Sequence, residues 1–255
     1  MNHNLHHTSG ADVQMQLLTT PEDLVAEKEI QLLLKPVRHS APDAVVPLVL
    51  QHEAPFHLII LSEDLQHFQH LHPQLQNNDS YQVAVTFPAG GRYLLYADYQ
   101  PEGASPLVDQ IPLQVAGHGH QPVITTGEKL TATTGDFSTE IDPAISLHAG
   151  TSVLLPFRIK RNGHLLKATE LSSYLGAVAH LILIHQDDKD FLHIHPQAGT
   201  DVPIIAHTRF EKAGSYRLWV QFKIDGTVYT ADFTLDVKAT LHTAPEQQQI
   251  HHHRG

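Results

Sequence analysis

The sequence predicts an all-β protein composed of two tandem antiparallel β-sandwich domains. Three observations lead to this prediction. A long stretch of the chain repeats at an offset of 123 residues, its apolar residues alternate with polar ones or form short runs, and turn residues recur between those runs at roughly 8–15-residue spacing. Because a long period that occurs twice indicates tandem domains rather than a solenoid, each copy is expected to be one sandwich.

The expected strands follow from the apolar pattern in order along the chain. In the stretch 81–87, every second residue is apolar, as in a strand with one buried face. Other stretches are short apolar runs bounded by turn residues. The expected strands include 30–34, 45–50, 81–87 and 93–96 in the first copy, and 153–159, 179–184, 216–222 and 229–237 in the second.

Identical residues recur at the same offset over positions 57–99, where 13 of 43 positions match without a gap. The matches include His57-Leu58-Ile59 with His180-Leu181-Ile182, His70-x-His72-Pro73-Gln74 with His193-x-His195-Pro196-Gln197, and Gly91-x-Tyr93 with Gly214-x-Tyr216. Each tyrosine of the last pair enters a strand after a Gly-containing turn, as in the tyrosine corner of Greek-key sandwiches, which indicates a structural role.

The repeat also places the domain boundaries. We expect a His-rich disordered tail at 1–12, sandwich domain 1 at 13–116, a linker at 117–127, sandwich domain 2 at 128–238, and a second His-rich disordered tail at 239–255. The linker is assigned from its Gly and Pro residues, and the tails from their polar composition.

Composition excludes several classes of function. Of 255 residues, 41% are apolar and 17% are charged, and the formal charge is −11. This charge argues against binding nucleic acid or anionic lipid, both of which require clustered Lys and Arg. The chain has no Cys and two Met, so thiolate sites and thioether-rich Cu(I) sites are excluded. Histidine is the unusual residue, with 22 copies.

Three of these histidines are expected to meet on one hairpin of each domain. If 57–61 and 66–72 pair as antiparallel strands around a turn between Glu63 and Asp64, His57 lies opposite His70. His72 is two residues further and therefore on the same face. The second domain repeats this arrangement with His180, His193 and His195.

Three imidazoles on one face suit a metal ion. Neutral imidazole nitrogens bind Zn(II) and Cu(II) alike, and a tridentate set leaves one coordination position open. A structural interpretation remains, because Phe68 and Phe191 share this face and the face can be interior. Packing alone would accept Leu or Val there without the desolvation cost of unpaired imidazoles. We expect the histidines without a counterpart in the other domain to be surface residues: His39, His52, His67, His148, His164, His185 and His207.

The second copy also resembles a known family. The segment Tyr174-Leu175-Gly176-Ala177, followed by His180 and by His193-Ile194-His195-Pro196, is similar to bacterial proteins, mostly exported or membrane-attached, that carry Tyr-Leu-Gly-Ala, His and His-x-His-Pro in a small β-sandwich. The resemblance implies a cupredoxin- or immunoglobulin-like fold and heavy-metal or copper binding, with no established activity. It is weaker in the first copy, where Glu53-Ala54-Pro55-Phe56 stands at the expected place of Tyr-Leu-Gly-Ala.

The leading functional hypothesis is a non-enzymatic binder of Cu(II) or Zn(II) for metal buffering, sensing or delivery, with a protein metal donor or acceptor as partner. The alternatives are a three-histidine metalloenzyme, either hydrolase or oxidoreductase, and a structural or interaction module without metal. Hydrolase and phosphate-binding motifs are missing from the sequence.

Neither a membrane span nor a signal peptide is evident, so the chain as written is expected to be cytoplasmic. It is expected to be periplasmic or extracellular if an export signal is missing.

Overall fold

A computed structural model describes residues 3–4, 11–119 and 125–240. Most of the two predicted tails, residues 1–2, 5–10 and 241–255, lies outside the described residues, as do residues 120–124 of the predicted linker. The described chain is built from strands, with short 3-10 turns at Pro21–Asp23 and Ala168–Glu170.

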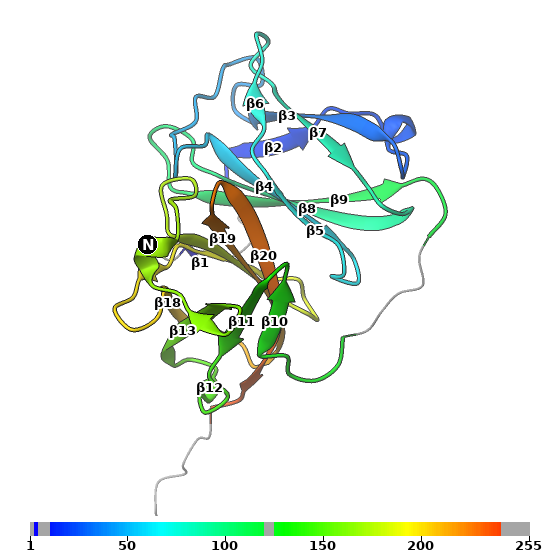
Figure 1. Cartoon of the computed structure of the whole chain (residues 1–255). Coiled ribbons are helices and arrows are strands. Elements are labelled where there is room, and N and C mark those ends of the chain that lie inside the picture. Colours follow the sequence, from blue (N-terminus) through cyan, green and yellow to red (C-terminus); the bar gives the residue numbers. More distant parts are fainter. Residues whose placement is uncertain (1–2, 5–10, 120–124, 241–255) are drawn as a thin grey trace, which may run out of the picture.

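The strands fall into two sets along the chain (Figure 1). The first set comprises β2 (Val13–Leu17), β3 (Glu29–Arg38), β4 (Phe56–Ser62), β5 (Phe68–Leu71), β6 (Gln74–Leu75), β7 (Tyr81–Thr86), β8 (Gly91–Tyr99) and β9 (Leu107–Val115). The second comprises β10 (Thr131–Thr134), β11 (Phe137–Ile141), β12 (Leu147–His148), β13 (Ser152–Arg161), β14 (His164–Leu165), β15 (Ala179–His185), β16 (Phe191–Ile194), β17 (Gln197–Ala198), β18 (Ile204–Arg209), β19 (Gly214–Ile224) and β20 (Thr227–Lys238). A two-residue strand, β1 (His3–Asn4), pairs with β16.

Each set forms a sandwich of two sheets. In the first sandwich the strand orders are β2-β3-β7-β6 and β5-β4-β8-β9. The second has the same two orders in β11-β13-β18-β17 and β16-β15-β19-β20, extended by β10, by β12 and by β1. In the first sandwich the chain forms β2–β3, β4–β5, β6–β7 and β8–β9 as neighbouring pairs and crosses to the other sheet after each pair, as in Greek-key sandwiches. The predicted all-β class of two tandem antiparallel β-sandwiches is confirmed.

Alternate residues of each strand fill the core between its two sheets. In the first sandwich, Leu32 of β3 and Leu58 and Ile60 of β4 belong to one buried apolar cluster. Phe157 of β13 and Leu181 of β15 belong to the corresponding cluster of the second sandwich. This alternation is the period of two that the sequence shows.

The tyrosine corners are present in both sandwiches. The Tyr93 hydroxyl donates to the backbone oxygen of Ala89 at 2.9 Å, and the Tyr216 hydroxyl donates to that of Lys212 at 3.0 Å. Each bond ties the start of β8 or β19 to the loop four residues upstream. The structural role predicted for these tyrosines is confirmed.

One expected strand is wrong. Residues 45–50 form an irregular loop with a single bridge between Leu48 and Pro101, and Val45 and Leu50 are 57% and 70% exposed. Pro47 within the run has no N–H to donate to a sheet ladder, so the apolar stretch does not become an interior strand.

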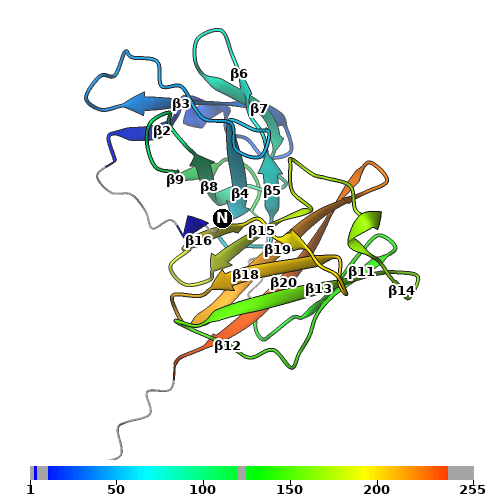
Figure 2. The same ribbon diagram turned by 90° about the vertical axis from the view of Figure 1, so that its left-hand side faces the viewer.

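The two sandwiches pack against each other through their β4–β8 and β15–β19 sheets (Figures 1 and 2). The residues of β4 and β15 that do not face their own cores, Ile59, Leu61, Ile182 and Ile184, form a third buried apolar cluster between the sandwiches. Both faces of β4 and β15 are therefore buried, which explains why all their residues are inaccessible.

Aromatic side chains cross this interface reciprocally. Phe68 stacks on Trp219 with ring centroids 4.9 Å apart, and Phe191 stacks on Tyr96 at 5.0 Å. Phe68 and Phe191 are equivalent in the repeat, and so are Tyr96 and Trp219. The interface therefore has an approximate two-fold symmetry, in which each sandwich offers the same surface to the other.

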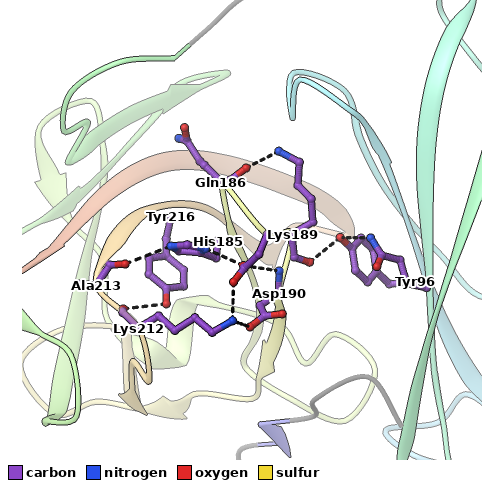
Figure 3. Close-up of polar contacts among 10 residues, drawn as sticks. Tyr96, His185, Gln186, Lys189, Asp190, Lys212, Ala213 and Tyr216 are labelled. Carbon is purple, nitrogen blue, oxygen red and sulfur yellow. Dashed lines mark hydrogen bonds and ion pairs between the residues drawn. The ribbon is translucent and has the colours of Figure 1, made fainter. Parts of the chain in front are cut away.

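A polar contact beside the Tyr96 stack also joins the sandwiches. The Tyr96 hydroxyl donates to the backbone oxygen of Lys189 at 2.8 Å (Figure 3). Lys212 contacts both Asp188 and Asp190, the neighbours of Lys189, and so stabilises the loop that carries this oxygen. The aromatic stack and the hydrogen bond thus fix the same edge of the interface.

Candidate metal centre

The histidine hairpins form as predicted, but in a different register. β4 pairs with β5 so that Ile59, not His57, lies opposite His70. The register is shifted by two residues because the turn is centred one residue later than expected, with Leu65 in the left-handed region at φ 58°. A shift of two keeps every side chain on its predicted face, so His57, His70 and His72 still point the same way.

The triads lie in the interface between the sandwiches. His57 and His193 are 1% exposed, His180 is 0% and His70 is 8%. His72 and His195 are half-buried. The face of each hairpin that carries the triad is thus buried, as the structural interpretation expects. It is covered by the other sandwich and does not face the core of its own.

The two triads adjoin across the interface. The ring centroids of His57 and His193 are 5.2 Å apart, and those of His70 and His180 are 5.6 Å apart. Within the triads the ring separations are 4.3–5.5 Å. The structure therefore brings all six predicted residues into one group, called here the six-histidine cluster.

The imidazole nitrogens of each triad converge. His57 Nδ1 lies 2.9 Å from His70 Nε2 and 3.2 Å from His72 Nε2. In the second triad, His180 Nδ1 lies 3.3 Å from His193 Nε2. Three nitrogens bound tetrahedrally to one Zn(II) ion lie about 3.3 Å apart. Among the described residues, these two triads are the groups of three or more metal-ligand side chains whose donor atoms lie within 4.8 Å of one another.

One ring nitrogen of His57 and of His180 donates to a backbone oxygen in a tight turn. His57 Nε2 lies 3.3 Å from the oxygen of Gln51, and His180 Nε2 lies 2.9 Å from that of Tyr174. Gln51 and Tyr174 are equivalent in the repeat, and each begins a four-residue turn closed by a bridge to Ala54 or Ala177.

These turns explain the Tyr-Leu-Gly-Ala motif. Leu175 and Gly176 have φ of 50° and 73°, and the left-handed conformation at the second position favours Gly. The equivalent segment in the first sandwich is Gln51–Ala54. It begins two residues before the stretch compared with the motif in the sequence, so that comparison was out of register.

The other two orienting contacts cross the interface. His70 Nδ1 lies 2.7 Å from Gln221 Oε1 of the second sandwich, and His193 Nδ1 lies 2.7 Å from Asp98 Oδ2 of the first. Asp98 and Gln221 are equivalent in the repeat. Sequence reasoning missed both, although each is a polar residue within an otherwise apolar run, a signal of a buried polar contact.

These contacts decide which nitrogen of each ring carries the proton. A backbone oxygen and a carboxylate can only accept, so the protons lie on Nε2 of His180 and on Nδ1 of His193. The remaining nitrogens, His180 Nδ1 and His193 Nε2, then face each other with lone pairs. Two lone pairs at 3.3 Å repel each other, and a cation between them would remove that repulsion.

Burial favours the neutral form of five of the six rings. It lowers the pKa of His57 from 6.5 to about 3 and the pKa of His72 and His180 to about 4, with neighbouring histidines adding repulsion at His57 and His180. The same causes hold the pKa of His70 and of His195 well below its ordinary range. Neutral imidazole is the form that binds metal.

His195 supplies an independent test of whether a metal ion fits. Both its ring nitrogens are buried and have no hydrogen-bond partner in the protein. Such atoms carry a desolvation cost that coordination would remove. The donor set, three neutral imidazoles per triad, also suits Zn(II) and Cu(II).

One histidine expected at the surface is half-buried against the six-histidine cluster, and another is buried. His52 stacks on His195 with ring centroids 3.6 Å apart and planes 20° from parallel. His185 is buried, between the carboxylate of Asp188 at 2.7 Å and the backbone oxygen of Ala213 at 3.3 Å (Figure 3). The sequence feature that accompanies this burial is Gly214, because a Cβ at that position would collide with the His185 ring. The others, at exposed or half-buried positions, are His39, His67, His148, His164 and His207.

Fold and site together define a tandem β-sandwich protein with one histidine triad in each half. The chain belongs to the family described as a domain of unknown function (DUF8832), which matches it twice, over residues 7–115 and 132–239. That family has no assigned function, so the copper-binding label implied by the sequence resemblance stays a prediction. No curated protein matches the chain.

Solved structures resemble the chain at low similarity. The fibronectin(III)-like modules of Clostridium thermocellum CbhA are 12% identical, with a TM-score of 0.23, over 95% of this chain and 100% of that one. A Ca2+-stabilised, ice-binding adhesin of an Antarctic bacterium is 6% identical, with a TM-score of 0.26, over 91% of this chain and 50% of that one. Invasin, a bacterial integrin-binding protein, is 11% identical, with a TM-score of 0.25, over 89% and 39%. No helix in the described part of the chain is long and apolar enough to span a membrane.

Proposed function

We propose that the protein is a non-enzymatic binder of Cu(II) or Zn(II) that holds one ion at each histidine triad and serves metal buffering, sensing or delivery. The ligands would be His57, His70 and His72 in the first sandwich. In the second they would be His180, His193 and His195.

The arrangement of the second triad carries this proposal. His180 Nδ1 and His193 Nε2 point at each other at 3.3 Å, while the opposite nitrogen of each ring is committed to an oxygen acceptor. His195 joins them with both nitrogens buried and unbonded. A proton shared by the two rings would also separate the lone pairs, but burial disfavours a charged His180. A metal ion would in addition use the nitrogens of His195, which a shared proton leaves unbonded.

Exchange with a protein donor or acceptor would occur at the half-buried edge of the cluster. His72 and His195 are the more accessible ligand of each triad, and the turns at Gln51–Ala54 and Tyr174–Ala177 lie beside them. An ion could therefore enter from this edge while the apolar faces of the β4–β8 and β15–β19 sheets stay in contact.

Metal stoichiometry tests the proposal. The untagged chain, trimmed of residues 1–12 and 239–255 to remove the tail histidines, is titrated with Zn(II) and with Cu(II). We expect two ions per chain at micromolar concentration. The pair His70→Ala with His72→Ala, or the pair His193→Ala with His195→Ala, should leave one ion, and all four together should leave none.

The matched control is His39→Ala with His164→Ala, which removes two exposed histidines and should leave two ions bound. If the trimmed wild-type chain binds no ion, or if the quadruple variant binds as well as wild type, the metal proposal is wrong. The cluster would then be part of a structural module.

A further inference from the structure

The two triads differ in the residue that orients them from across the interface. His193 in the second triad donates to the carboxylate of Asp98, whereas His70 in the first lies at the same 2.7 Å from the amide oxygen of Gln221. These are equivalent positions of the repeat on opposite sides of an approximate two-fold axis. One triad therefore has a negative charge at its outer hydrogen bond and the other a neutral dipole.

This difference matters because the cluster is buried. A divalent ion held by three neutral imidazoles brings two positive charges into a low-dielectric interface. Asp98, itself 2% exposed, offsets part of that charge and increases the basicity of His193 Nε2 through the shared proton. Gln221 orients His70 equally well but offsets no charge.

A second asymmetry acts in the same direction. The ring of His52 stacks on the ring of His195, with the two ring centroids 3.6 Å apart. The equivalent position beside the first triad is Leu175, which has no ring to stack. His195 is thus held by a stacked imidazole that the first triad lacks.

We infer that the second triad retains its ion and the first triad exchanges its ion, and that Asp98 is the positioning residue that sets most of this difference. The inference rests on the proposed function and adds a division of labour between its two sites. Outer-sphere partners of this kind typically change metal affinity by about 10–100-fold.

Release kinetics test the inference. The full chain is loaded with two equivalents of Zn(II) and mixed with an excess of a coloured chelator. We expect release in two phases of equal amplitude whose rates differ by about 10–100-fold. His70→Ala with His72→Ala should leave only the slow phase, and His193→Ala with His195→Ala should leave only the fast phase.

A charge swap separates the role of Asp98 from general stability. Asp98→Asn keeps an oxygen acceptor for His193 and should accelerate the slow phase toward the fast one. Gln221→Glu should slow the fast phase. The double swap, Asp98→Asn with Gln221→Glu, keeps the number of charges and should make the first triad release Zn(II) more slowly than the second. Combining the swap with each double His→Ala variant assigns each rate to its triad. General destabilisation cannot produce such a reversal.

The possible failures are distinguishable. A wild-type chain that takes up no Zn(II) overturns the proposed function. A chain that takes up two ions but releases them at one rate, or a loaded swap variant that keeps the wild-type order, overturns the division between sites alone. If Asp98→Asn does not fold, as shown by its circular dichroism, Gln221→Glu decides by itself, and an unchanged fast phase counts against the inference.

Discussion

At the scale of single residues, one hydrogen bond orients each of four ligand rings through one ring nitrogen and turns the other nitrogen toward the triad. His57 and His180 are oriented by backbone oxygens of their own sandwich, and His70 and His193 by side chains of the other. The rings of His70 and His193 lose their orienting hydrogen bonds if the two sandwiches separate. The ligand geometry is therefore a property of the assembled pair of sandwiches.

A single hydroxyl outside the site offers a direct measurement at this scale. Tyr216→Phe removes the donor to the backbone oxygen of Lys212 and should lower the free energy of unfolding by about 0.5–1.5 kcal/mol. Tyr93→Phe, the equivalent change, should cost a similar amount. Urea unfolding of both variants checks this, and a variant as stable as wild type would contradict the structural role of that corner.

At the scale of elements, strand alternation predicts which residues share a face but not what covers that face. The even spacing of His57 and His70 correctly puts them on one side of the hairpin, while their exact register depends on the conformation of Leu65 in the turn. Nothing in the local pattern of β4 shows that its second face meets β15, because an apolar residue there is equally compatible with a core. Asp98 was missed for the same reason.

The stacked aromatic pairs make the interface accessible to spectroscopy. Trp219 is the single tryptophan of the chain and lies against Phe68 between the sandwiches. Phe191→Ala removes the other stack and should destabilise the chain by about 3–5 kcal/mol, as expected for a buried aromatic ring. Phe191→Leu, which retains much of the volume, should cost less.

Urea unfolding followed by Trp219 emission measures this loss, because the ring becomes exposed when the sandwiches separate. A Phe191→Ala variant that unfolds at the wild-type urea concentration would show that the interface contributes little to stability.

At the scale of the whole molecule, the apolar interface and the six-histidine cluster share one surface. Ile59, Leu61, Ile182 and Ile184 hold the sandwiches together without metal, and the cross-interface bonds to His70 and His193 require that docking. Anything that binds only the docked form stabilises it, so metal binding and docking are thermodynamically linked.

Stability should depend on pH in a direction set by the buried rings. The unfolded chain protonates near pH 6.5, whereas the folded pKa is about 3 for His57 and about 4 for His72 and His180. As the pH falls from 6.5 toward 4, the unfolded chain takes up protons that the folded chain does not, so stability present above 6.5 is lost.

Below pH 6.5, each histidine that stays neutral in the folded chain should lower the free energy of unfolding by about 1.4 kcal/mol per pH unit. Urea unfolding of the metal-free protein between about pH 8 and pH 5 measures it. An unfolding free energy that stays constant over this range would mean that the rings are not held neutral.

The linker should be dispensable for docking. A protease site in place of residues 120–124 would cut the chain between the sandwiches, and we expect the two halves to elute together on gel filtration because the interface is apolar and reciprocal. Ile182→Lys in the same cut chain places a charge in that interface and should separate them. Separation of the cut chain without this substitution would contradict the expected strength of the interface.

Because the two sandwiches belong to one chain, positions related by the approximate two-fold axis can hold different residues. A homodimer of one such sandwich would carry the same residue at symmetry-related positions, so its two sites would be identical by necessity. In a tandem chain the copies are encoded separately, and a change in one half has no obligatory partner in the other. Asp98 and Gln221 occupy matching positions and are different residues, a pairing that a true homodimer cannot encode.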